Sequence, residues 1–84
     1  MKWAEDNNVF CRKLQWIGRR NAPDRVFGFN GRTIFVEFKR PGERLRVGQD
    51  KEIDRMRAAG MEAYGPVDSF TRFLRIIGGR RRVI

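Results

Sequence analysis

The dipeptide Asn30-Gly31 constrains the fold more than any other feature of this chain. It separates two apolar runs, at residues 25–29 and 32–39. Asn-Gly is the strongest short-range signal for a β-hairpin, because both central residues of a type I′ turn need positive φ. A two-residue turn also fixes the register, so positions whose numbers sum to 61 face each other across the two strands. The chain is therefore expected to contain a sheet in which the direction of each side chain can be worked out.

This register places two carboxylates side by side. Asp24 lies opposite Glu37, and directly opposed residues project to the same face with their Cβ atoms about 4.5–5.5 Å apart. Lys39, two residues beyond Glu37, points to that face as well. Two opposed like charges need compensation, which a shared proton, a salt bridge from Lys39 or a neighbouring arginine, or a divalent cation would each supply. Mg²⁺ and Mn²⁺ suit a ligand set of oxygens without histidine or cysteine.

Hydrophobic patterning predicts the rest of the organisation. The hairpin is apolar on both faces: one carries Phe27, Phe29, Ile34, Val36 and Phe38, and the other carries Val26, Phe35 and the two acids. The remaining predicted elements are a helix over 2–8, a strand within 9–17 (with a helix as the alternative), loops over 18–23 and 40–46, a helix over 47–59 that stops at Gly60, a strand over 61–64 ended by Gly65-Pro66, and a helix from Asp68 or Ser69 to Ile77. Residues 78–84 are expected to form a mobile basic tail.

Gln49 is out of place in the predicted helix over 47–59. At about 100° per residue it falls in the centre of the arc that carries Glu52, Ile53 and Met56, where a polar side chain does not suit packing. It could instead reach the sheet face and hydrogen-bond to a ligand or to a metal-bound water. The alternative is a helix-start residue near solvent.

Composition narrows the function classes. The 84 residues carry 15 Arg and 4 Lys against 10 acidic residues, a formal net charge of +9, with one Cys and no His. These counts exclude Ser/His/Asp and Cys/His triads, a Cys/His zinc finger and an intrachain disulfide. The arginine excess points to phosphate, and so to nucleic acid, as the partner. The length favours one domain over residues 1–84, and no apolar run approaches the roughly 18 residues of a membrane span, so we expect a soluble cytoplasmic protein.

The residues around the two acids resemble a known nuclease superfamily. Pro23-Asp24 followed by Glu37-Phe38-Lys39 is similar to the PD-(D/E)xK pattern. A longer ordered set is more specific and is similar to a stand-alone VRR-NUC domain of the phage and bacterial type. That set is Gly18-Arg19-Arg20-Asn21-Ala22-Pro23-Asp24-Arg25, Phe35-Val36-Glu37-Phe38-Lys39-Arg40-Pro41-Gly42, Gln49 and Arg57-Ala58-Ala59-Gly60. Two features depart from the family: Asn21 stands where Gly is usual, and the last strand lacks the Val-Arg-Arg that gives the family its name.

The resemblance implies an α/β fold with a small mixed β-sheet flanked by helices. It also implies a Mg²⁺- or Mn²⁺-dependent endonuclease that hydrolyses phosphodiester bonds in branched DNA. Stand-alone members resemble Holliday junction resolvases, which act as homodimers in a bacterial or phage-infected cell. The implied site consists of Asp24 and Glu37 as metal ligands, the Phe38 main-chain carbonyl as a further ligand, Lys39 as the catalytic lysine, and Gln49. Family members carry one more active-site glutamate on an N-terminal helix, and Glu5 is the open candidate for it here.

Five arginines flank this predicted site in sequence and are the expected phosphate contacts: Arg19, Arg20, Arg40, Arg44 and Arg46. Two other functions stay open. A non-catalytic basic nucleic-acid-binding module would use the acids as ordinary structural charges. A site-specific restriction-type nuclease of the same superfamily would have to read base edges, for which 84 residues leave little protein.

Overall fold

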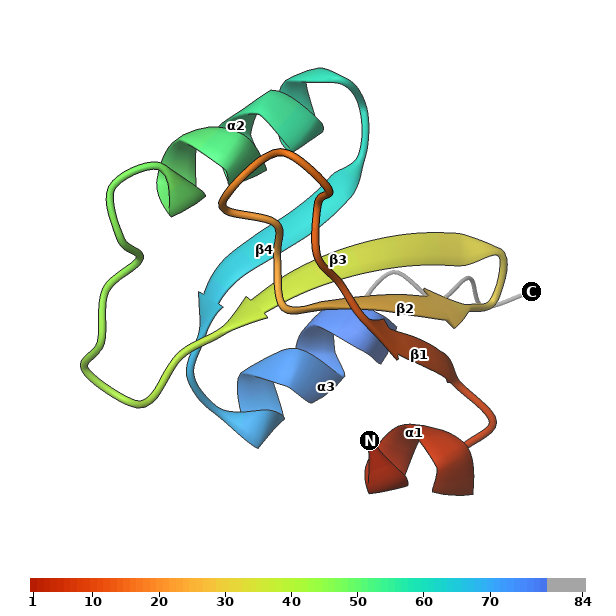
Figure 1. Cartoon of the computed structure of the whole chain (residues 1–84). Helices are drawn as coiled ribbons and strands as arrows, with labels where there is room; N and C mark the ends of the chain where they lie inside the picture. The colour runs from red at the N-terminus through yellow and green to blue at the C-terminus, as the bar shows by residue number, and fades with distance from the viewer. Residues whose placement is uncertain (79–84) are drawn as a thin grey trace.

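Four strands and three helices make up the part of the chain that the structure describes, residues 1–78 of a computed structural model (Figure 1). In chain order they are α1 (Lys2–Asp6), β1 (Phe10–Lys13), β2 (Arg25–Phe29), β3 (Arg32–Phe38), α2 (Gln49–Ala58), β4 (Glu62–Val67) and α3 (Phe70–Gly78). The strands form one mixed sheet in the order β1-β2-β3-β4, in which β3 and β4 run parallel and the other neighbours antiparallel. The expected mixed α/β fold is confirmed. None of the described helices is long and apolar enough to cross a membrane.

The β2–β3 hairpin has the predicted register. Phe29 pairs with Arg32, and the pairing continues in step to Arg25 and Val36. The turn residues Asn30 and Gly31 have φ values of 52° and 75°, as a type I′ turn requires. The arithmetic from the turn is therefore confirmed along the whole of β2.

Helices α2 and α3 cover opposite faces of this sheet, above and below it in Figure 1. On the α3 face, Phe27 is fully buried with its ring centroid 4.8 Å from that of Phe73. Helix α1 packs on the same face, where the Trp3 ring lies 5.3 Å from Phe73. On the α2 face, Phe35 packs against the buried cluster of Ile53, Met56 and Ala63. The predicted division of the apolar side chains between two faces is confirmed. Burial of each fully buried ring stabilises the fold by about 1.5–3 kcal/mol.

The N-terminal strand is shorter than the segment from which it was predicted. The helix predicted over 2–8 forms over Lys2–Asp6, and the strand predicted within 9–17 forms but ends at Lys13. Leu14 still donates its main-chain N–H to the Asp24 carbonyl over 2.9 Å, after which the chain leaves the sheet. Trp16 instead turns its indole toward α2, where it hydrogen-bonds to Glu52 over 2.7 Å. Tertiary contacts therefore set this boundary rather than the apolar alternation.

Two predicted boundaries, the start of α2 and the end of β4, are wrong, and each lies at a glycine. Helix α2 begins at Gln49 instead of residue 47, since Gly48 has φ +99°, outside helical geometry. Strand β4 runs past Gly65-Pro66 to Val67 instead of ending there. Proline is tolerated because β4 is an edge strand. A side chain at Gly65 would not fit, because its Cβ would lie 2.8 Å from the Ile53 Cδ1 and 2.9 Å from the Glu37 Cβ.

The last helix follows the prediction at its start and exceeds it at its end. The Ser69 hydroxyl accepts the main-chain N–H of Arg72 over 3.1 Å, which makes it the N-terminal cap. Helix α3 includes Gly78, which was expected to begin the tail. The rest of the predicted tail, residues 79–84, lies outside the described residues.

Candidate active site

Glu37 is a charged side chain buried in the sheet. It sits at the penultimate position of β3, on the face covered by α2, and only 3% of it is exposed. Its Oε2 accepts a hydrogen bond from the Gln49 amide over 3.0 Å and lies 3.5 Å from the Lys39 ammonium. The structure thus brings together three of the predicted site residues, supplied by the end of β3 and the start of α2.

Gln49 is anchored at both ends of its amide. Its Oε1 accepts the main-chain N–H of Arg46 over 2.8 Å, while its Nε2 donates to Glu37. The side chain is 4% exposed, in the buried arc where the helical periodicity placed it. Its partner, however, is the carboxylate itself, whereas the expected partner was a ligand or a metal-bound water. The loop before α2 is in this way tied directly to the acid.

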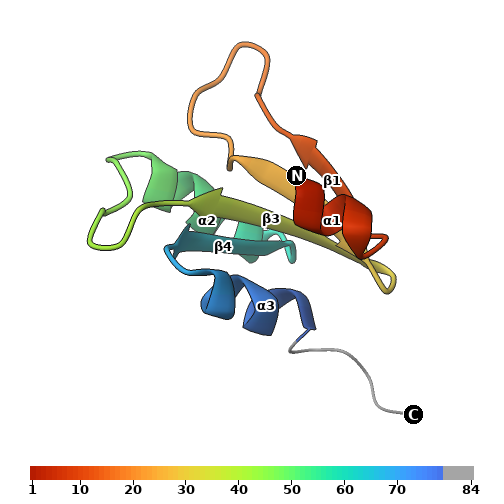
Figure 2. The ribbon, with the colours of Figure 1, turned by 90° about the horizontal axis from the view of Figure 1, so that it is seen from below.

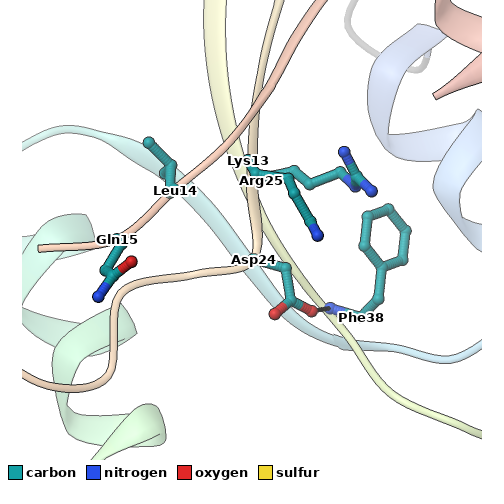
Figure 3. Close-up of a pocket in the computed structure, with 6 residues that line it drawn as sticks. All are labelled: Lys13, Leu14, Gln15, Asp24, Arg25 and Phe38. Atoms are coloured by element: carbon teal, nitrogen blue, oxygen red, sulfur yellow. Dashed lines mark hydrogen bonds between the residues drawn. The ribbon is translucent and has the colours of Figure 1, made fainter.

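Asp24 lies immediately before β2, next to the end of β3. Its Oδ2 accepts the main-chain N–H of Phe38 over 2.9 Å, so contact between the two strands continues past the last paired residues of β2 (Figure 3). Asp24 is exposed, in contrast to Glu37. The two acids therefore differ in environment: one is open to solvent, the other is enclosed by protein.

The electrostatics of Glu37 show that the acids act on each other. Burial raises the pKa of Glu37 above the ordinary glutamate value, and the charge of Asp24 raises it further. Lys39 opposes this by its charge and a hydrogen bond, which lower the pKa. The net direction is upward, so Lys39 offsets only part of the cost of ionising Glu37 in this place.

The donor set at this point fits Mg²⁺ or Mn²⁺. Two neighbouring carboxylates offer only oxygen ligands, and a divalent cation would remove the mutual penalty seen in the pKa of Glu37. Within residues 1–78 no group of three or more acidic, histidine or cysteine side chains is placed to hold a metal. An ion here would have to take its other ligands from main-chain carbonyl, water or phosphate oxygens, which Mg²⁺ commonly does.

An open pocket of about 630 Å³ lies beside Asp24, between the end of β1 and the start of β2 (Figure 3). Lys13 and Arg25 line it, whereas Gln15, also in its lining, points away from them in Figure 3. Sequence reasoning missed both basic residues. The pairing of Lys13 with Arg25 across β1 and β2 would have indicated them, but the sequence did not determine the register of these two strands.

The five candidate phosphate contacts fall into two groups. Arg19, Arg20 and Arg46 line one pocket together with Leu14, Gln15, Trp16, Asn21, Ala22 and Val47, and we call it the arginine pocket. Arg40 and Arg44 are exposed on the loop between β3 and α2, outside that lining. Figure 2 shows this loop and the one before β2 at the end of the sheet opposite the hairpin turn. Both groups therefore lie at the same end of the molecule as the acids.

A second buried acid, Glu52, supports the arginine pocket. It accepts the Trp16 indole N–H, and its Oε1 lies 3.5 Å from Arg19 and 3.2 Å from Arg55. The indole hydrogen bond is the main reason that the pKa of Glu52 lies below the ordinary glutamate value, with the two arginines adding to it. The sequence placed Glu52 in the buried arc of the helix but gave no indication of these partners.

Glu5 is not brought to the acid pair. It is exposed on α1, a helix that packs on the α3 face of the sheet, whereas Glu37 faces α2. The N-terminal helix of this chain has only five residues. The structure therefore leaves the N-terminal acid of the family pattern without a counterpart at this position.

Comparison with known proteins agrees with this geometry. A solved structure described as a VRR_NUC domain is similar to this chain, with a TM-score of 0.81 and 28% sequence identity over 95% of this chain and 87% of that one. No protein-family model and no curated protein matches. The small mixed sheet with its three helices is therefore the fold of a VRR_NUC domain.

Proposed function

We propose that this protein is a Mg²⁺- or Mn²⁺-dependent endonuclease that hydrolyses phosphodiester bonds in branched DNA, with four-way junctions as its main substrate. The observation that carries the proposal is the buried Glu37 beside Asp24, held by Lys39 and Gln49. The similarity to the VRR_NUC domain supports it, because that fold is associated with PD-(D/E)xK nucleases.

Each residue has a role in this proposal. Asp24 and Glu37 would hold the cation with the Phe38 carbonyl, and the bound ion would polarise a phosphoryl oxygen and lower the pKa of a water. In the reaction the water gives up a proton to solvent as its oxygen bonds to phosphorus, one ester P–O bond breaks with its electron pair going to the leaving oxygen, and that oxygen takes up a proton from solvent. Lys39 orients the water and offsets negative charge on the phosphate. Gln49 keeps the Glu37 carboxylate in place.

Phosphate binding is assigned to the arginines at the same end of the molecule. Arg19, Arg20 and Arg46 form one contact surface, and Arg40 and Arg44 form a second on the neighbouring loop. Log affinity falls as log salt concentration rises, and the removal of one guanidinium that contacts a phosphate makes this slope less steep by about one. Replacing any one of the five by alanine is expected to reduce that slope without changing preference between sequences.

The test is cleavage of a labelled four-way junction. Cutting should require Mg²⁺ or Mn²⁺ and should vanish in Glu37→Ala while junction binding is retained. Glu5→Ala is the matched control, since it removes a glutamate from the other face of the sheet and should cut as the wild type does. A protein that binds junctions but never cuts them with either metal would instead be the non-catalytic binding module. Cutting of linear duplex at one sequence would favour the restriction-type alternative.

We further propose that the protein acts as a homodimer. Coordinated cleavage of two strands of a junction calls for two sites related by a two-fold axis, and one 9.9 kDa subunit is small beside a junction. The α3 helix leaves Phe70 and Leu74 exposed, at 52% and 38%. Light scattering at micromolar concentration tests the oligomeric state, and a monomer would contradict the proposal.

A further inference from the structure

Two apolar side chains project into solvent beside the arginine pocket. Ile17 is 100% exposed and Val47 is 91% exposed, although folding usually buries both residue types. Val47 lines the arginine pocket, and Ile17 follows Trp16, which lines it too. A single exposed aliphatic residue is ordinary in a folded protein, but here one lines the arginine pocket and the other directly follows a lining residue in the chain, which gives a surface that is part charged and part apolar.

The loops that carry these two residues are held in fixed positions. Trp16 is bound to α2 through its 2.7 Å hydrogen bond to the buried Glu52. The two loops also touch, because Gly48 lies so close to Asn21 that a Cβ on the glycine would be 2.6 Å from the asparagine Nδ2. The folded positions of the two loops therefore keep the side chains of Ile17 and Val47 exposed; we call these two side chains the apolar tips.

This region connects directly to the acid pair. Arg46, which lines the arginine pocket, donates its main-chain N–H to Gln49, and Gln49 donates to Glu37. The arginine pocket and the pocket beside Asp24 also share lining residues at positions 14 and 15. A DNA strand bound along the arginines would thus run beside the acids and meet the apolar tips on the way.

We propose that Ile17 and Val47 form an apolar wedge that contacts unstacked bases at a DNA branch point and so selects branched over linear DNA. This inference rests on the proposed function. The guanidinium groups account for phosphate binding, but aliphatic side chains gain nothing from phosphates. They gain from covering base faces, which a continuous duplex hides by stacking and a branch point leaves accessible.

The experiment replaces both tips by serine, Ile17→Ser/Val47→Ser, and measures binding to a four-way junction and to a linear duplex with the same arm sequence. EDTA prevents cleavage, and 2-aminopurine at the branch point reports unstacking by its rise in fluorescence. We expect the double variant to bind the junction about tenfold more weakly, to lose most of the fluorescence rise and to bind duplex unchanged. Met61→Ser, at a 39% exposed apolar residue beside the hairpin turn, is the control and should match the wild type.

The two readouts decide the proposal without any cleavage. An unchanged fluorescence rise, or an equal loss of affinity for duplex, would overturn it. A change of oligomeric state in the double variant by light scattering would also overturn it, because a second copy would then cover the tips. A different result would contradict the proposed nuclease activity: junctions that are bound but never cut with Mg²⁺ or Mn²⁺.

Discussion

Replacing Gln49 by glutamate tests the contact on which the candidate site is built. In the native protein the Gln49 amide donates to Glu37 over 3.0 Å, and both side chains are buried. A second carboxylate would set two negative charges at this separation, for which Coulomb's law at an effective dielectric constant of about 20 gives about 5–6 kcal/mol of repulsion. The folded variant avoids this by binding one proton, because a protonated acid at position 49 donates to Glu37 as the amide does.

The free-energy cost of keeping the new carboxyl group at position 49 protonated sets the loss of stability. An ordinary glutamate has a pKa of about 4.3, so keeping the group protonated at pH 7 costs about 3.7 kcal/mol, and the cost changes by about 1.4 kcal/mol per pH unit. The pKa at position 49 is raised by folding, so stability is lost as the pH rises above the ordinary value. We expect Gln49→Glu to be about 4 kcal/mol less stable than the wild type at pH 7 and nearly as stable near pH 4.5.

Urea denaturation in EDTA at pH 5, 6 and 7, followed by tryptophan fluorescence, measures this dependence. Gln15→Glu is the matched control, because it makes the same change at an exposed glutamine and should leave stability unchanged. Gln49→Met removes the hydrogen bond to the carboxylate without adding charge, and should cost about 1.5–3 kcal/mol at pH 7 without the rise in cost with pH that a second carboxylate brings. If Gln49→Glu loses no more stability at pH 7 than at pH 5, the two side chains do not meet and the reasoning is wrong.

Asp24→Asn should lower the pKa of Glu37 by removing the neighbouring charge that raises it; an unchanged midpoint in a carboxyl ¹³C NMR titration would contradict this. Gly65→Ala should cost about 1–3 kcal/mol in urea denaturation, since the new Cβ would lie 2.9 Å from that of Glu37. Gly78→Ala, with nothing within 4 Å, should cost nothing, and equal losses would refute the packing argument. Arg32→Lys should cost about 2 kcal/mol of stability, because lysine cannot keep the two hydrogen bonds to Glu62 and the two to main-chain carbonyls at the end of α3. If Tm falls by less than about 2 °C, this reasoning is wrong.

The hairpin could be predicted because everything that fixes it is local. Asn30 and Gly31 select the turn, and the turn determines which residues face each other, so the proximity of Asp24 and Glu37 followed from counting. Gln49 could be predicted for a similar reason, since helical periodicity alone placed a polar group in the buried arc of α2. The wrong boundaries near α2 and β4 concern glycines whose backbone geometry or close contacts appear only in the fold.

The pocket beside Asp24 and the arginine pocket could not be predicted, because both depend on contacts between segments that no short turn connects. Nine residues separate Leu14 from Asp24, so no turn fixes the register of β1 on β2, and the pairing of Lys13 with Arg25 was invisible. The bond between Trp16 and Glu52 spans 36 residues and gives no periodic signal, yet it positions the loop that carries Ile17, one of the two residues of the proposed wedge. Sequence spacing therefore identifies groups that a single turn or helix brings together. The loops that would choose among DNA shapes are specified by packing across the whole sheet, so substrate preference has to be argued from the structure.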